Sequence, residues 1–198
     1  MSVNIVLKDK NKTYLAVDSQ ITCGGESIIG TNINALKMWK VKGLDSCYMA
    51  HCGRLRDACA IRSEDLISRR DIYEGDIDFE YVVNYFVPNI VSKLEDAEFL
   101  KINNNYIDKL NSDFFLVYND KAFSIDKDLS VVEIENYDAH GSGKYNALGS
   151  LASTVGLDPI ERIKKAMCAG CNNIYVDFPI YIVDVENDNI TKIGKEDL

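Results

Sequence analysis

Residues 3–18 read VNIVLKDKNKTYLAVD, and this stretch decides the fold. Its two ends, residues 3–7 and 13–17, are rich in β-branched, aliphatic and aromatic side chains. Between them lies a polar segment, residues 8–12, that contains three lysines, an aspartate and an asparagine. Two strand-like runs about a short polar segment predict an antiparallel β-hairpin at the start of the chain.

The register of this hairpin returns the end of its second strand to the start of the chain. If Lys8 lies opposite Thr13, then Val3 lies opposite Asp18. A register error of one residue would move Asp18 only a few ångströms along the strand. We therefore expect the Asp18 carboxylate to lie close to the first residues of the chain.

The rest of the 198 residues alternates between blocks of strands and blocks of helices. Apolar spacing predicts strands at 27–29, 37–41 and 47–50, helices at 53–68 and 78–100, strands at 113–118, 122–125 and 129–134, helices at 144–154 and 159–170, and strands at 180–186 and 190–193. Pro88 should kink or split the second helix. Segregated blocks exclude a simple βαβ alternation and predict one α+β domain over residues 1–198.

Composition excludes several classes of protein. Hydrophobic residues make up 46% and charged residues 27%, which is typical of a globular domain. Acidic residues outnumber basic ones by 31 to 22, a net charge of −9, and this balance is unfavourable for nucleic-acid binding. No apolar stretch approaches the ~20 residues of a membrane-spanning helix, and the start does not resemble a signal peptide. We therefore expect a cytoplasmic protein, no membrane, and six reduced, mostly buried cysteines.

Three motifs that could carry chemistry do not meet the requirements of their chemistry. The segment 141–144, GSGK, lacks the glycine and the Ser or Thr of a phosphate-binding loop, because Asp138 and Tyr145 stand there. His51 and Cys52 are adjacent on a strand and point to opposite faces, so they cannot form a nucleophile pair. A pair of His140 with a distant cysteine stays open, although the sequence gives no geometric support for it. The acidic run at 71–80 lacks calcium-loop spacing. We expect neither a metal nor a cofactor.

The chain start offers a fourth arrangement. Met1 precedes Ser2, and a small second residue generally permits removal of the initiator methionine. Ser2 would then carry a hydroxyl nucleophile and a free α-amine, whose reference pKa of ~8 suits a general base near neutrality. A lysine nearby would favour the neutral amine, and an aspartate would keep that lysine charged. In the simpler interpretation, Ser2 is an ordinary second residue and Asp18 caps a turn.

Five segments, in colinear order, resemble segments of proteasome β subunits and of the bacterial proteasome-like peptidase HslV. They are the strand end YLAVDSQ (14–20), the lysine-bearing strand LKMWKV (36–41), the helix entry CGRLRDA (52–58), the loop AHGSG (139–143) followed by ALG (147–149), and the segment from Ala169 to Tyr175. Together they span nearly the whole chain.

The resemblance implies an N-terminal nucleophile hydrolase with a four-layer αββα sandwich, in which two antiparallel sheets lie between helix layers. It assigns Ser2 as nucleophile, Asp18 and Lys37 as its charged partners, Gly53 as an oxyanion-hole amide, and Ser142 as a supporting serine. The implied reaction is hydrolysis of peptide bonds in a polypeptide substrate through an acyl-enzyme ester.

The family also implies a homo-oligomeric ring, often fed by an ATPase that unfolds substrates. This chain departs from the family in two ways. Serine stands where threonine is usual, and Asn173 and Val176 occupy places where the family has an acid and a serine. The alternative interpretation is therefore a ring subunit of the same fold that no longer cleaves and acts as a scaffold or binding module.

Overall fold

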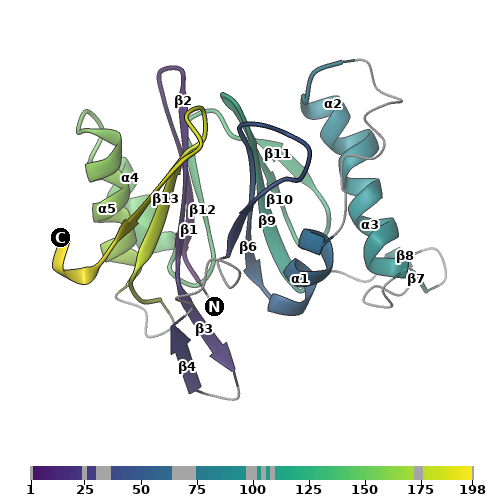
Figure 1. Ribbon diagram of the computed structural model, residues 1–198, viewed down its shortest axis with the longest axis horizontal. Helices are drawn as coiled ribbons and strands as arrows, with labels where there is room; N and C mark the ends of the chain where they lie inside the picture. The colour runs from purple at the N-terminus through teal and green to yellow at the C-terminus, as the bar shows by residue number, and fades with distance from the viewer. Residues whose placement is uncertain are drawn as a thin grey trace.

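A computed structural model of the chain describes residues 2–23, 26–29, 37–63, 75–96, 102–103, 106–107, 110–171 and 176–197. Two five-stranded antiparallel sheets pack face to face, and helices cover the outer face of each sheet (Figure 1). This four-layer αββα arrangement confirms the fold class predicted from the sequence.

The first sheet contains the N-terminal hairpin at its centre. Its strand order is β12 (Tyr137–His140), β1 (Asn4–Asp9), β2 (Lys12–Asp18), β13 (Ile180–Asp184) and β14 (Asn189–Ile193). Lys8 pairs with Thr13, and the backbone N–H of Asp18 donates to the carbonyl of Val3 at 3.2 Å, so the predicted register is confirmed.

The second sheet supplies the opposite wall of the interior. Its strand order is β11 (Val131–Glu133), β10 (Lys121–Ile125), β9 (Ser112–Tyr118), β6 (Cys47–Gly53) and β5 (Met38–Lys40). Two small two-stranded sheets accompany it, β3 (Gln20–Cys23) with β4 (Glu26–Ile29), and β7 (Ile102–Asn103) with β8 (Tyr106–Ile107). Strands β3, β7, β8 and β12 were not among the strands that the sequence predicts.

Helices α4 (Lys144–Ser153) and α5 (Pro159–Gly170) cover the first sheet, while α1 (Leu55–Ser63), α2 (Phe79–Tyr81) and α3 (Val87–Asp96) cover the second (Figure 1). The side chain of Asp158 caps α5 by accepting from the backbone N–H groups of Ile160 and Glu161. A short 3₁₀ turn, Lys195–Asp197, follows β14. The predicted helix at 53–68 begins two residues later, at Leu55, because Gly53 ends β6, and it is confirmed as far as Ser63. Residues 64–74 lie outside the described part.

The long helix predicted over 78–100 is interrupted near Pro88. A π-helical segment, η3 (Val82–Phe86), separates α2 from α3, and the N–H of Val87 donates to the carbonyl of Val82. Proline has no N–H to donate, so a regular α-helical ladder cannot pass through position 88. The helix is therefore not split in two: it is continuous from Phe79 to Asp96, and a π-helical segment before Pro88 interrupts its α-helical hydrogen bonding.

Five cysteine side chains are described, and all five are free thiols. Cys47 and Cys52 are buried, Cys168 and Cys171 are partly exposed, and Cys59 is exposed. The expectation of mostly buried cysteines is therefore wrong for the described ones, because only the two on strand β6 are buried. No described helix is both long and apolar enough to cross a bilayer.

Candidate active site

The end of β2 places Asp18 directly beside the first residues of the chain. Its two carboxylate oxygens accept from different backbone amides, Oδ1 from Val3 at 3.0 Å and Oδ2 from Gln20 at 3.1 Å. Asp18 is fully buried. The hairpin register therefore holds one carboxylate between the chain start and the beginning of β3.

Lys37, just before β5, completes a buried ion pair with Asp18. Its Nζ lies 2.8 Å from both carboxylate oxygens, and the two side chains are 5% and 0% exposed. Burial raises the pKa of Asp18, while the charge and hydrogen bonds of Lys37 and the two backbone amides act in the opposite direction. The pair joins segments that are 19 residues apart.

Ser2 is 3% exposed and is held by groups from both sheets. Its carbonyl oxygen accepts from the N–H of Gly143 at 3.3 Å. Gly141, at φ +97°, lies so close to the same carbonyl that a Cβ there would collide with it. Burial raises the pKa of the neighbouring Cys52 thiol, and a hydrogen bond with the Ser2 hydroxyl lowers it by less. Ser2 thus occupies a fixed position between the two sheets.

One cavity of about 200 Å³ brings most of these residues together. It is lined by Ser2, Gln20, Ile21, Thr22, Lys37, His51, Gly53, Arg54 and Leu55. Asp18 lies behind Lys37. Ser142 does not line this cavity; it is exposed in the loop before α4, next to Gly143, whose amide holds Ser2. The structure therefore gathers Ser2, Asp18, Lys37 and Gly53 and places Ser142 outside the cavity lining.

Gly53 ends β6 with φ +137°, a conformation that other residues rarely adopt. A Cβ there would collide with the Asn111 carbonyl. The next residue, Arg54, donates to the buried Asp57 from Nε at 2.7 Å, and the Ser112 hydroxyl donates to the other oxygen of Asp57 at 3.0 Å. This network fixes the start of α1 at the mouth of the cavity.

Two neighbours of the cavity were not assigned a role from the sequence. His51 and Cys52 do face opposite sides of β6, since His51 contacts Trp39 and Phe114 on the helix side whereas Cys52 lies against Ser2. Burial lowers the pKa of His51 to about 4, so its ring is neutral near pH 7. The sequence carried one signal for the placement of His51 and Cys52, which is that successive side chains along a strand point to opposite faces.

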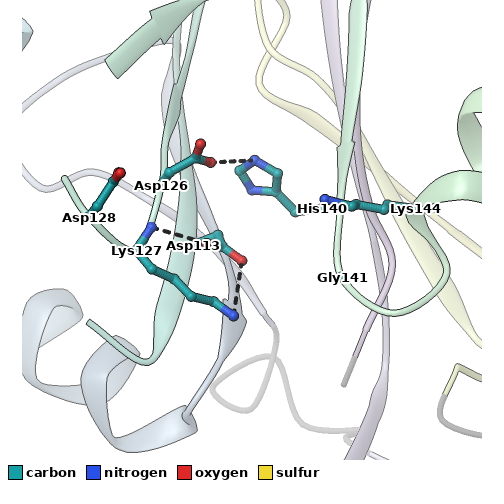
Figure 2. Close-up of a pocket in the computed structure, with 7 residues that line it drawn as sticks. All are labelled: Asp113, Asp126, Lys127, Asp128, His140, Gly141 and Lys144. Carbon is teal, nitrogen blue, oxygen red and sulfur yellow. Dashed lines mark hydrogen bonds and ion pairs between the residues drawn. The ribbon is translucent and has the colours of Figure 1, made fainter. Parts of the chain in front are cut away.

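A second, polar cavity lies on the other side of Gly141. It has a volume of about 350 Å³ and is lined by Asp113, Asp126, Lys127, Asp128, His140, Gly141 and Lys144 (Figure 2). The His140 Nε2 lies 2.8 Å from the Ser124 hydroxyl oxygen. Burial lowers the pKa of His140 to about 3, so neither histidine is suited to act as a base near neutrality.

The remaining sequence candidates have structural roles where they are described. Asp78 caps α2 by accepting from the N–H of Tyr81, and Asp76 pairs with Lys121 at 2.9 Å. Within the described ranges, no group of three or more His, Cys, Asp or Glu side chains could hold a metal ion. Asn173 lies outside the described residues, and Val176 is buried beneath α5.

No protein-family model matches the chain, and no curated protein sequence matches it. Solved structures do. BPH from Thiobacillus denitrificans superimposes with a TM-score of 0.71 at 17% identity, covering 98% of this chain and 100% of that one. The fold is that of the proteasome-like N-terminal nucleophile hydrolases.

Two further proteasome-like structures agree. Eukaryotic HslV from Trypanosoma brucei gives a TM-score of 0.65 at 14% identity, over 91% of this chain and 97% of that one. Anbu from Yersinia bercovieri, described as an ancestral beta-subunit, gives a TM-score of 0.69 at 11% identity, over 98% of this chain and 88% of that one. The resemblance to the proteasome-like hydrolases stated from sequence motifs is thus confirmed at the level of the fold.

Proposed function

We propose that the chain is a proteasome-like peptidase subunit whose nucleophile is Ser2, exposed by removal of Met1. The observation that carries this proposal is the buried pair of Lys37 and Asp18, in which Asp18 also binds the Val3 amide. A buried pair without a function contributes little net stability, so its place beside a serine hydroxyl and a cavity favours a catalytic role.

In the proposed reaction, the free α-amine of Ser2 takes the proton from the Ser2 hydroxyl as its oxygen attacks the substrate carbonyl. The charge of Lys37 disfavours the ammonium form of that amine and so keeps it available as a base. Asp18 holds the ammonium of Lys37 in place. In this scheme the N–H of Gly53 would stabilise the developing oxyanion, and Ser142, in the loop before α4, would support the amine.

The amine then returns its proton to the nitrogen of the leaving peptide. The carbon–nitrogen bond breaks and leaves an ester between the substrate acyl group and Ser2. A water molecule, deprotonated by the same amine, hydrolyses the ester and regenerates the hydroxyl. No cofactor or metal enters this scheme. The assembly proposed with it is a cytoplasmic homo-oligomeric ring that receives polypeptides from an ATPase unfoldase.

Intact-mass measurement and peptide hydrolysis test the proposal. The purified active protein should lack the mass of Met1, and Ser2→Ala should abolish hydrolysis of fluorogenic peptides. Ser153→Ala, an exposed serine at the end of α4, is the matched control and should retain full activity. Retention of Met1 in purified protein that does not hydrolyse peptides would support the non-cleaving ring subunit instead. Equal rates for wild type and Ser2→Ala would exclude Ser2 as nucleophile.

A further inference from the structure

The polar cavity beyond Gly141 has the size and the walls of a ligand site. Its volume of about 350 Å³ falls within the ~300–1,000 Å³ usual for small-molecule pockets. It lies between the two sheets, where β12 ends at His140 and the loop from β10 carries Asp126, Lys127 and Asp128 (Figure 2). The mechanism proposed above makes no use of it.

Carboxylates outnumber cations around this cavity. Asp113, Asp126 and Asp128 line it with Lys127 and Lys144, and Asp138 lies 4.0 Å from the His140 ring. Lys127 is already engaged by Asp113, through its backbone N–H at 3.2 Å and its Nζ at 3.9 Å. Within the described part of the chain, no lysine or arginine pairs with Asp126. The charge of Asp126 also raises the pKa values of Asp113 and Asp138, after burial, so these carboxylates repel one another.

His140 provides a second, independent feature. Its side chain is 7% exposed, its ring stacks on Phe115 at 3.8 Å, and its Nε2 faces the Ser124 hydroxyl, Asp126 and Asp138. The Ser124 hydroxyl donates to Asp126 Oδ1 at 3.5 Å, so its oxygen is left to accept from Nε2–H of His140, and in that tautomer Nδ1 is an acceptor. Nδ1 has no partner among the described residues, and it points into the space between Asp113 and Gly141 (Figure 2).

We propose that this cavity binds an organic cation, a guanidinium or alkylammonium group that pairs with Asp126 and donates a hydrogen bond to Nδ1 of His140. A group with several N–H donors satisfies both acceptors at once, and the planar fork of a guanidinium does so best. A metal ion fits less well, because His140 Nε2 already bonds Ser124 and lies 3.8 Å from Asp126. Burial and, to a smaller extent, the charges of Lys144 and Lys127 lower the pKa of His140 and keep its ring neutral, so His140 does not cancel the carboxylate charge itself.

Calorimetric titration with N-acetyl-L-arginine amide tests the proposal on the full chain. We expect saturable binding that weakens as salt rises, and at least tenfold weaker binding of the neutral analogue N-acetyl-citrulline amide. Asp126→Asn should raise the Kd about tenfold, while His140 labelled with ¹⁵N should show a shift of its Nδ1 resonance on binding. Asp45→Asn, which removes a more exposed carboxylate outside the cavity lining, is the control.

Four results would overturn the proposal. These are no binding of the arginine amide, equal weakening by Asp45→Asn and Asp126→Asn, preferential binding of N-acetyl-glutamate amide, and displacement of the arginine amide by Zn²⁺ or Mg²⁺.

Two sources of the cation are separated by repeating the titration on Ser2→Ala protein with an arginine-containing hexapeptide. Tighter binding of the hexapeptide supports a polypeptide side chain as the ligand, and equal binding supports a free small cation. Because the readout is binding, failure of the proposed peptidase activity would leave this result unaffected.

Discussion

Replacement of Lys37 by methionine tests whether the buried pair at the candidate site is intact and charged. Lys37 Nζ lies 2.8 Å from each oxygen of Asp18, and both side chains are almost completely enclosed. At an effective dielectric constant of ~20, this separation corresponds to an attraction of about 6 kcal/mol, which desolvation of the two groups largely offsets. Methionine removes the attraction but leaves the Asp18 carboxylate without its cation. We therefore expect Lys37→Met to lower the free energy of unfolding by ~3–5 kcal/mol.

Urea unfolding followed by circular dichroism measures this change through the transition midpoint. Lys40→Met is the matched control, because Lys40 is 41% exposed and pairs with Asp45 and Asp188 at the surface. That control should leave the free energy of unfolding nearly unchanged. The double variant Lys37→Met/Asp18→Asn removes both charges and should recover most of the lost stability while remaining unable to hydrolyse peptides. If Lys37→Met were no less stable than Lys40→Met, the pair would not be the buried, charged contact inferred here.

Three further predictions concern pH, backbone fit and the support of the cavity. The pKa values of His51 and His140 are lowered to about 4 and about 3, below the ~6.5 of an unfolded histidine. The contribution of these two neutral rings to the free energy of unfolding is therefore complete above pH 6.5 and is lost as the pH falls. Between pH 6.5 and 5, protonation of these two rings in the unfolded chain should lower the free energy of unfolding by ~3 kcal/mol, and a flat urea-denaturation profile over that range would contradict this. Gly141→Ala places a Cβ against the Ser2 carbonyl at a residue with positive φ. We therefore expect this variant to lose ~2 kcal/mol of unfolding free energy and to lose peptide hydrolysis. Unchanged hydrolysis kinetics would show that the contact does not constrain Ser2. Asp57→Ala should lower the free energy of unfolding by ~3 kcal/mol and speed amide hydrogen exchange in α1, because Asp57 accepts from Arg54 and Ser112. Unchanged exchange would mean that these hydrogen bonds do not fix the helix.

The parts of the fold that depend on local pairing could be predicted from the sequence. The N-terminal hairpin is one, since a short polar turn between two alternating strands fixes its register, and Asp18 follows from that register. The start of α5 at Asp158 is another such part, because the cap depends only on residues next to it in the sequence.

Contacts between distant segments could not be predicted in this way. The segment Tyr137–His140 pairs with β1, more than 130 residues earlier, and its own sequence carries few β-branched side chains. The contact between Lys37 and Asp18 was expected only from the resemblance to proteasome-like peptidases. The polar cavity around His140 is assembled from β9, the β10–β11 turn and the start of α4, so no single segment contains its signal.

The position of Ser2 depends on the assembly of the whole sandwich. Asp18 holds the adjacent Val3 amide from the first sheet, Gly143 holds the Ser2 carbonyl from the loop before α4, and Cys52 contacts the Ser2 hydroxyl from the second sheet. None of these anchors lies within ten residues of Ser2, so the hydroxyl is placed only when both sheets have docked. A serine that was an ordinary chain start would need none of these contacts, because exposed N-terminal residues are usually held by few interactions. The convergence of three separate segments on Ser2 and the adjacent Val3 is therefore an argument for the nucleophile that is independent of the motifs.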